Sequence, residues 1–296
     1  MIKKIPANQY VCLYCVACLD IMGVTRELSP YFDNEFVLAQ EKHDEFNAAI
    51  GPLVEFIKNF RKYFRSFFGE LDQLNHKINI SFFSDGFYVG VPLGEEMYSS
   101  NDHSPIILGI SYLLKTCGLI FLMSLFFERL LRAGIDIGGG VELKNDEIFG
   151  PALIKAYKLE KKAKYPRIII RNSLIEYLET QKAGNISTYN QSVEDIQKCQ
   201  RIATGCLNLI ENDKNFVENK KDSFYILDYL NEEFIKMWRK TEKFDSSLNF
   251  DEIIKSSFQY VEQSLNQVQS DPALKKKYIY LLEYMQQRII SANITI

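Results

Sequence analysis

Two aspartates stand beside tight turns at the ends of predicted strands, and together they point to metal binding. Asp20 ends an apolar strand that begins near Tyr10, and a turn at Gly23 follows it. Asp85 lies in a hairpin turn between two further predicted strands, 78–83 and 88–91. Carboxylate oxygens suit magnesium or manganese, and a pair of such cations can clamp the phosphates of a substrate. The two carboxylates therefore predict a site for two divalent cations and a phosphate-bearing substrate.

The histidines and cysteines indicate no second kind of site. The histidines are scattered over predicted helices and loops without a catalytic partner: His43, His76 and His103. The cysteines lack the histidines and loops of a zinc site, and we expect reduced core residues: Cys12, Cys15, Cys18, Cys117, Cys199 and Cys206. The alternative for Cys12-x-x-Cys15 is a redox or metal pair, although the pair lies inside a predicted strand. Reduced cysteines favour a cytoplasmic location.

Composition limits the possible partners. The chain has 296 residues, 47% of them hydrophobic, which is enough for a full core and one or two domains. Its formal net charge of -3 gives no general attraction to nucleic acid or anionic lipid, so we expect neither as a partner. No signal peptide is expected, because Lys3 and Lys4 precede polar residues rather than an apolar run.

One apolar segment raises the question of a membrane. Residues 106–127 carry a single charge, Lys115, and the part after it, 116–127, is shorter than the ~20 residues that span a bilayer. We therefore expect a buried helix, with a transmembrane segment as the alternative.

The order of predicted elements indicates an α+β fold, in which a mixed β-sheet is covered by helices. In chain order we expect a strand over 10–20, helices over 34–74 interrupted at Pro52, the hairpin around Asp85, an apolar helix over 104–131, strands over 132–140 and 141–149, and a helix from Gly150-Pro151 to Ala163. We place a first domain over 1–171 and a mainly helical C-terminal extension over 172–296, whose last helix opens at Asp271-Pro272.

Four blocks of this sequence together resemble the class III nucleotidyl cyclases, and among them the pyrimidine cyclases of the bacterial Pycsar anti-phage systems. The blocks are 19–25, 83–86, 131–138 and 148–168. Their order and spacing match the family over about residues 10–171. The resemblance implies a catalytic domain of the ferredoxin-like, palm type over 1–171, with the helical extension after it.

The resemblance also implies roles for individual residues. Asp20, Asp85 and the backbone carbonyl of Ile21 would bind two divalent cations, Mg2+ or Mn2+. Arg132 would contact the triphosphate, for which its fork of donors is suited; the alternative is a surface arginine at a strand end. The triphosphate would also face the backbone N–H groups of four residues: Met22, Gly23, Val24 and Thr25.

This sequence departs from the family at the transition-state and base-reading positions. Ile154 and Lys158 stand where the family has an asparagine and an arginine; a lysine can stabilise developing charge, but an isoleucine cannot replace an amide. Ser81 and Glu147 stand where adenylate cyclases have a lysine and an aspartate. The Glu147 carboxylate could accept a hydrogen bond from cytosine N4 or uracil N3, so either pyrimidine fits. The alternative for Glu147 is a solvent-exposed side chain.

The resemblance thus implies a soluble, cytoplasmic homodimer with two composite sites, which converts UTP or CTP into 3',5'-cyclic UMP or cyclic CMP and pyrophosphate. The product would be a second messenger in anti-phage defence, linked only indirectly to a cyclic-nucleotide effector. The aromatic stripe over 53–68 and the apolar helix from Ile106 would add to the dimer interface.

Two other functions remain open. A catalytically weak, cyclase-like nucleotide sensor is favoured by Ile154, whereas the retention of Asp20 and Asp85 speaks against it. A related palm-type enzyme, such as a dinucleotide cyclase or polymerase, also places carboxylates at strand ends. The turn Ser84-Asp85-Gly86 lacks the doubled glycine and following acid of the dinucleotide cyclases.

Overall fold

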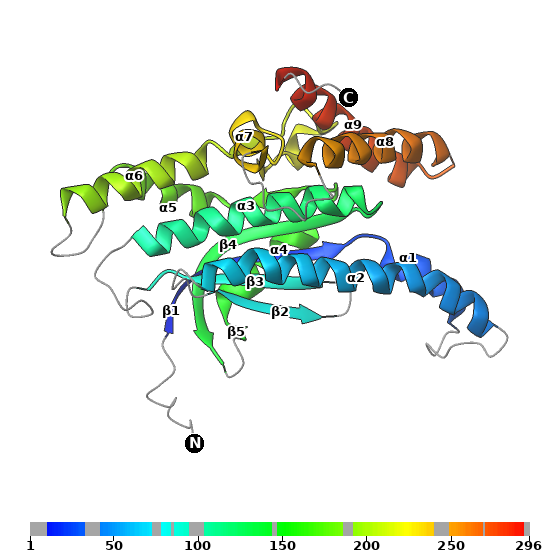
Figure 1. Ribbon diagram of the computed structural model, residues 1–296, viewed down its shortest axis with the longest axis horizontal. Coiled ribbons are helices and arrows are strands. Elements are labelled where there is room, and N and C mark those ends of the chain that lie inside the picture. The colour runs from blue at the N-terminus through cyan, green and yellow to red at the C-terminus, as the bar shows by residue number, and fades with distance from the viewer. Residues whose placement is uncertain are drawn as a thin grey trace.

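The computed structural model describes residues 11–32, 42–72, 78–83, 86–94, 104–143, 147–185, 192–239, 249–268 and 270–292. Ser84 and Asp85 lie outside these ranges, so the predicted metal ligand Asp85 is not described. A mixed eight-stranded sheet forms the centre, with the order β2-β3-β1-β4-β6-β8-β7 and with β5 paired to β4 (Figure 1). The strands are β1 Val11–Ile21, β2 Asn79–Phe83, β3 Gly86–Pro92, β4 Leu131–Glu142, β5 Ile148–Phe149, β6 Ile168–Ile170, β7 Ile210–Asn212 and β8 Tyr225–Leu227.

Helices cover both faces of this sheet, which confirms the predicted α+β fold. The helices are α1 Val24–Leu28, α2 His43–Asp72, α3 Ser104–Phe126, α4 Pro151–Lys162, α5 Asn172–Lys182, α6 Val193–Leu207, α7 Glu232–Arg239, α8 Phe250–Gln267 and α9 Pro272–Ser291. Strand β1 is a nearly continuous apolar run because both of its faces are buried. Tyr14, Val16 and Cys18 pack in a cluster with α4, whereas Cys15 and Leu19 pack in the larger core with α3. A strand buried on both faces has no polar face to alternate with.

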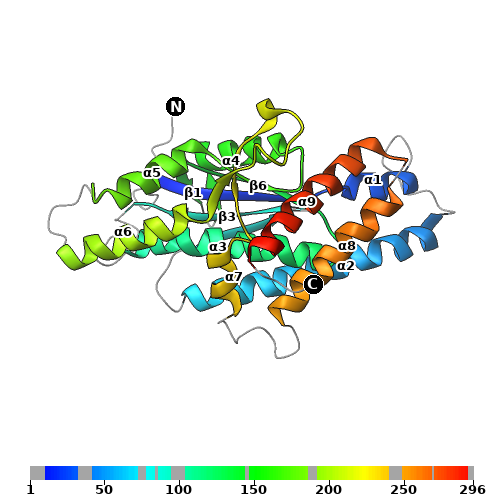
Figure 2. The ribbon, with the colours of Figure 1, turned by 90° about the horizontal axis from the view of Figure 1, so that it is seen from above.

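Helix α3 is a core helix of this fold. In Figure 1 it lies between the sheet and the C-terminal helices α8 and α9. Seen from above, one end of α3 lies near α5 and α6, and its other end lies near α8 and α9 (Figure 2). Within the described residues, one helical segment is long and apolar enough to cross a membrane, Ile106–Phe126, and 83% of its most apolar window is buried inside the protein. A helix that is apolar all round fits such a buried position. Because its surface is already covered, α3 does not supply the extra dimer area predicted for it.

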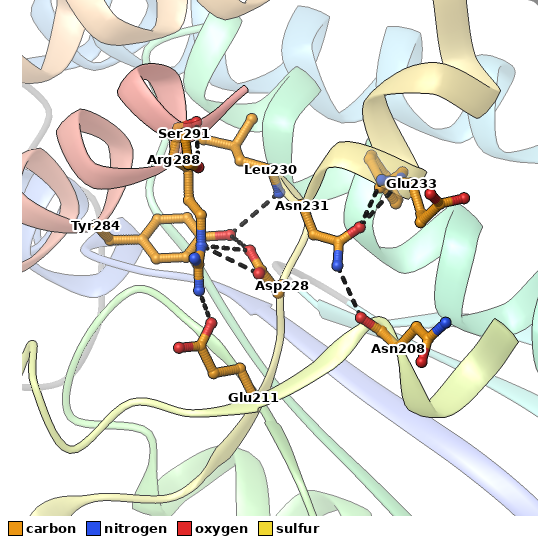
Figure 3. Close-up of polar contacts among 10 residues, drawn as sticks. Asn208, Glu211, Asp228, Leu230, Asn231, Glu233, Tyr284, Arg288 and Ser291 are labelled. Atoms are coloured by element: carbon orange, nitrogen blue, oxygen red, sulfur yellow. Dashed lines mark hydrogen bonds and ion pairs between the residues drawn. The ribbon is translucent and has the colours of Figure 1, made fainter. Parts of the chain in front are cut away.

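The C-terminal region continues the sheet. Strand β8 pairs antiparallel with β6, and β7 pairs with β8, so residues after 171 extend the same sheet. Helix α9 is tied to this edge by polar contacts, which Figure 3 shows around Asp228. The Tyr284 hydroxyl donates to Asp228 Oδ1 over 2.7 Å, and Arg288 pairs with both Asp228 and Glu211. The C-terminal helices and the sheet therefore share one core.

Three local predictions differ from the structure. Helix α2 continues through Pro52, where an interruption was expected; buried Leu53 and Phe56 just after it anchor the helix to the core. The strand expected over 141–149 is divided between the end of β4 and the two-residue β5. The apolar helix expected to reach 131 ends at Phe126, and Leu131 already begins β4.

Candidate functional site

The predicted site lies where β1 ends. In the antiparallel pairing of β1 with its two neighbours, Asp20 stands opposite Gly86 of β3 on one side and Arg132 of β4 on the other. Gly86 directly follows Asp85 in the chain. The sheet therefore brings Asp20, the predicted phosphate-binding arginine and the chain neighbour of the second predicted metal ligand to one place.

The chain leaves β1 through the predicted glycine turn. Gly23 has φ +94, a left-handed conformation that favours glycine, and α1 begins at Val24. The Met22 N–H donates to the Leu130 carbonyl over 2.8 Å, so it is not available to a triphosphate. The first N–H groups of a helix have no intrahelical acceptor, which leaves those of Val24 and Thr25 as the best donors of the predicted set.

Asp20 belongs to a cluster of two carboxylates and two cations. Arg132 donates to Asp20 Oδ2 from Nη2 over 2.7 Å and from Nε over 3.0 Å. Its Nε also lies 2.5 Å from Glu160 Oε1, an ion pair without good hydrogen-bond alignment. The Lys161 ammonium lies 3.6 Å from Asp20 and 3.4 Å from Glu160. Arg132 is therefore shared between a carboxylate on β1 and a carboxylate on α4.

The members of this cluster differ in exposure. Glu160 is buried, whereas the side chains of Arg132 and Asp20 are 22% and 15% exposed. Burial raises the pKa of Glu160, and the charge of Arg132 opposes this rise. Glu160 is thus a fixed, protein-facing partner of Arg132, while Asp20 faces the open side of the cluster.

Two glycines in β4 allow α4 to approach closely enough to form these contacts. A Cβ atom on Gly134 would lie 2.4 Å from the Glu160 nitrogen, and one on Gly138 would lie 2.9 Å from the Ala152 Cα. Any side chain at either position would push α4 away from the sheet. The glycines in this segment therefore serve a close helix–strand approach, which brings Glu160 over the β1–β4 pair.

The donors present fit a hard divalent cation. Among the residues that the structure describes, no three metal-ligating side chains meet, and the predicted partner Asp85 is outside them. Of the predicted metal ligands, the structure describes Asp20 and its chain neighbour Ile21. A carboxylate and a carbonyl oxygen are ligands that Mg2+ and Mn2+ prefer and softer metals do not. All described contacts of the Asp20 carboxylate go to Oδ2 from cations, which shows that this oxygen attracts positive charge.

The nearest thiol is not a reactive group. Cys18 faces the same side of β1 as Asp20, and its thiol contacts the Leu153 carbonyl over 3.9 Å. Burial raises the pKa of Cys18 to about 12, so the thiol stays protonated at neutral pH. All six cysteines are thiols rather than disulfides, as predicted, and five are buried.

The two predicted base-reading residues meet around a tyrosine. Ser81 on β2 is hydrogen-bonded to Tyr88 on β3, and the Ile148 N–H donates to the Tyr88 hydroxyl over 3.0 Å. Glu147 directly precedes Ile148 and is exposed. Burial raises the pKa of Tyr88, and the nearby Glu147 charge adds to this rise. Ser81 and Glu147 therefore both lie close to a neutral phenol.

The remaining predicted residues lie on the outer face of α4. Ile154 is 50% exposed and Lys158 is exposed. The α4 cation that reaches Asp20 is Lys161, three residues beyond Lys158. Lys158 instead lines a pocket between α4 and the start of α5.

Sequence reasoning missed Glu160, Lys161 and Tyr88. Glu160 had a detectable signal, because Ala152, Ala156 and Glu160 recur every four residues on the buried face of α4. A glutamate in such an apolar row requires a buried partner. Lys161 and Tyr88 had no comparable signal, since their roles depend on contacts between distant segments.

No protein-family model matches this chain, and no curated protein matches it. Solved structures of adenylyl and guanylyl cyclases resemble it in fold. The adenylyl cyclase CyaB from P. aeruginosa is 14% identical, with a TM-score of 0.41, and the match covers 74% of this chain and 95% of that one. The guanylyl cyclase Cya2 is 12% identical, with a TM-score of 0.37, and the match covers 74% of this chain and 91% of that one.

A third similar structure is a class III adenylyl cyclase-like ATP-binding protein from Pseudomonas aeruginosa. It is 12% identical, with a TM-score of 0.38, and the match covers 97% of this chain and 73% of that one. The structural similarity of this chain is therefore to adenylyl and guanylyl cyclases, at low identity and low TM-scores.

Proposed function

We propose that this protein is a metal-dependent nucleotidyl cyclase that converts UTP or CTP into the 3',5'-cyclic nucleotide and pyrophosphate. The observation that carries this proposal is the position of Asp20 between Gly86 and Arg132. That pairing joins a metal-ligating carboxylate, the chain neighbour of Asp85 and a phosphate-binding cation at one end of the sheet. Asp20 and Arg132 each belong to a sequence block that resembles the pyrimidine cyclases, 19–25 and 131–138.

The chemistry needs no protein nucleophile. Divalent cations held by Asp20, Asp85 and the Ile21 carbonyl would lower the pKa of the ribose 3'-hydroxyl and neutralise the departing pyrophosphate. Arg132 would exchange its contact with Asp20 for the phosphate oxygens, to which a guanidinium binds with two donors. Glu160 would keep its ion pair with Arg132 during this exchange and hold the guanidinium in place.

The base-reading part of the proposal rests on Ser81, Tyr88 and Glu147. A pyrimidine that enters beside Tyr88 would meet hydroxyl groups and a carboxylate, which can accept from cytosine N4 or uracil N3. The neutral phenol can also donate to a base oxygen, since its pKa is raised. These groups suit a small base with a donor edge.

We further propose a homodimer with composite sites, in which Lys158 of one protomer faces the triphosphate held by the other. Large apolar residues of β1 and β5 are exposed and would provide surface for a second copy: Val11, Leu13 and Phe149. The cyclic product would act as a cytoplasmic second messenger for a separate effector in anti-phage defence.

The test is to incubate the purified protein with ATP, GTP, CTP and UTP separately, with Mn2+, and to identify products by mass spectrometry. We expect a cyclic pyrimidine nucleotide from the wild type and none from Asp20→Asn or Asp85→Asn. The matched control is Asp251→Asn, which removes an exposed carboxylate on α8 and should keep full activity.

Two outcomes would count against this function. No product from any triphosphate, in protein with a normal unfolding transition, would contradict turnover. If a triphosphate still binds in that case, the nucleotide sensor becomes the better description, as exposed Ile154 in place of an asparagine would suggest. A cyclic purine product would contradict the base preference while it supports the cyclase reaction.

A further inference from the structure

A basic pocket lies beside α4 and borders the Asp20 cluster through Lys161, which lines both. It has a volume of about 530 Å³ and is bounded by α4, the start of α5 and strand β4. Its polar lining includes four lysines of α4, two residues at the start of α5 and one carboxylate of β4: Lys155, Lys158, Lys161, Lys162, Arg171, Ser173 and Asp136. We call it the α4–α5 pocket. Cations from two different helices thus face one cavity.

Most of these cations have no protein partner. Within the described part of the chain, Lys158, Lys162 and Arg171 form no ion pair and no side-chain hydrogen bond. Lys155 donates to a neutral acceptor, the Ile137 carbonyl, over 3.3 Å. Like charges gathered around a cavity repel each other, and a bound anion removes that repulsion.

The single carboxylate does not balance this charge. Asp136 is buried, and its Oδ1 accepts hydrogen bonds from the Ile137 N–H, over 2.7 Å, and from the Ser173 hydroxyl. Its described contacts are therefore with the strand and with the start of α5, not with the lysines. Asp136 fixes the wall of the pocket, and the net charge that a ligand meets stays positive.

The start of α5 adds to the preference for an anion. Arg171 is the N-cap residue of this eleven-residue helix, and no side chain caps its first N–H groups. The first turn also contains no acidic residue. Uncapped N–H groups and the helix dipole favour negative charge at this end. The three unpaired cations are the independent reason to place an anion here.

We propose that the α4–α5 pocket binds a polyphosphate, either the phosphate chain of a nucleotide or free pyrophosphate. The cations come from both α4 and α5, so several phosphate groups can be contacted at once, and the volume lies in the range of small-molecule sites. Phosphate oxygens suit the lysine point charges and the forked arginine alike. This inference requires no turnover at Asp20. Because Lys158 also belongs to the composite site proposed above, the test uses Lys162 and Arg171, which do not.

The experiment measures tripolyphosphate binding by calorimetry in EDTA, which prevents metal-dependent binding at Asp20. We expect the double variant Lys162→Gln/Arg171→Gln to bind about tenfold more weakly or worse than the wild type, because two charged contacts are lost. The matched control, Arg201→Gln/Lys255→Gln, removes one arginine and one lysine from the exposed faces of α6 and α8 and should bind like the wild type. Asp20→Asn should also bind normally.

Two further arms identify the source of the polyphosphate. Tighter binding of UTP or CTP than of tripolyphosphate would support a nucleotide, and equal binding of pyrophosphate would support the free product. The proposal is overturned if the wild type does not bind tripolyphosphate, or if the double variant binds as well as its control. Tighter binding in Asp20→Asn would place the anion at the Asp20 cluster, where this carboxylate competes for Arg132, and would overturn the proposal too.

Discussion

The protein holds arginine–carboxylate clusters in two regions that behave differently. At the end of β1, Arg132 is shared between Asp20 and Glu160, and three of the four charged side chains are partly exposed. At the far edge of the sheet, Arg167 pairs with Asp213, and both side chains are almost fully buried. There Asp213 also accepts from the Tyr280 hydroxyl and the Phe224 N–H.

This difference in burial separates a cluster that can exchange partners with a ligand from one that can only serve stability. The Arg167 guanidinium lies 5.1 Å from the ring centres of Tyr165 and Phe224, and it donates to the Asp222 carbonyl over 2.9 Å. Such a group has no freedom to bind a ligand. Arg132 has charged partners only, and a substrate can replace one of them. Exposure and exchangeable contacts therefore make the Arg132 cluster the candidate for function.

The two regions are physically connected. The Arg167 carbonyl accepts from the Ala133 N–H over 2.9 Å, and Ala133 directly follows Arg132. In the parallel pairing of β4 with β6, Ala133 stands opposite Ile168. The buried cluster therefore fixes the strand from which Arg132 projects.

The largest expected effect is the loss of the buried pair. Arg167→Ala leaves the Asp213 carboxylate buried without its cation, which should lower the free energy of unfolding by about 3–5 kcal/mol. The matched control is Arg129→Ala, whose pair with Glu27 lies at the surface and should contribute about 0–1 kcal/mol. Urea denaturation of both variants checks the comparison. Equal destabilisation by the two would show that burial does not distinguish these pairs.

A second prediction concerns pH at the same edge, around Asp228 (Figure 3). Burial raises the pKa of Asp228 to about 6, while the hydrogen bonds with Tyr284 and Leu230 oppose the rise. The pKa of an aspartate in an unfolded chain is about 3.9, so the folded protein binds the carboxyl proton of Asp228 more tightly than the unfolded chain does. The stability that Asp228 contributes is therefore present below about pH 4 and is lost as the pH rises through 6.

The measurement is the free energy of unfolding of the wild type and of Asp228→Asn between pH 4 and 7. The wild type should lose up to about 3 kcal/mol relative to the variant over this range. The ion pair of Asp228 with Arg288 acts in the opposite direction, which makes this value an upper bound. If the wild type instead became more stable relative to Asp228→Asn as the pH rises, the ion pair with Arg288 would outweigh the effect of burial.

Much of the sheet could be predicted because its signals are local. The apolar run that ends at Asp20 became β1, Pro151 lies in the first turn of α4, and Asp271 caps α9 through bonds to the next two N–H groups. Strands β7 and β8 could not be predicted, because three residues are too few to show a period. Their pairing depends on β6, which lies far away in the chain.

The site was predictable to the extent that single residues carry it. Asp20, Arg132, Ser81 and Glu147 were predicted from their positions in motifs, and the structure brings Asp20 to Arg132 and Ser81 and Glu147 close to Tyr88. The role of Glu160 requires α4 to cross the β1–β4 pair, a contact over more than a hundred residues of chain. Local periodicity does not contain such information.

The smallest expected effect tests whether the Arg132 contact is exchangeable. If the guanidinium competes with a cation for Asp20, Arg132→Gln should tighten Mn2+ binding in the absence of nucleotide by about fivefold, the equivalent of a surface ion pair of about 1 kcal/mol. Calorimetric titration with Mn2+ measures this, and Arg129→Gln controls for the loss of a nearby positive charge. Asp20→Asn should abolish the binding in either background. An unchanged or weaker Mn2+ affinity in Arg132→Gln would mean that Arg132 holds Asp20 in its ligating position, as Arg167 holds Asp213. The cluster around Arg132 would then be as fixed as the buried cluster around Arg167.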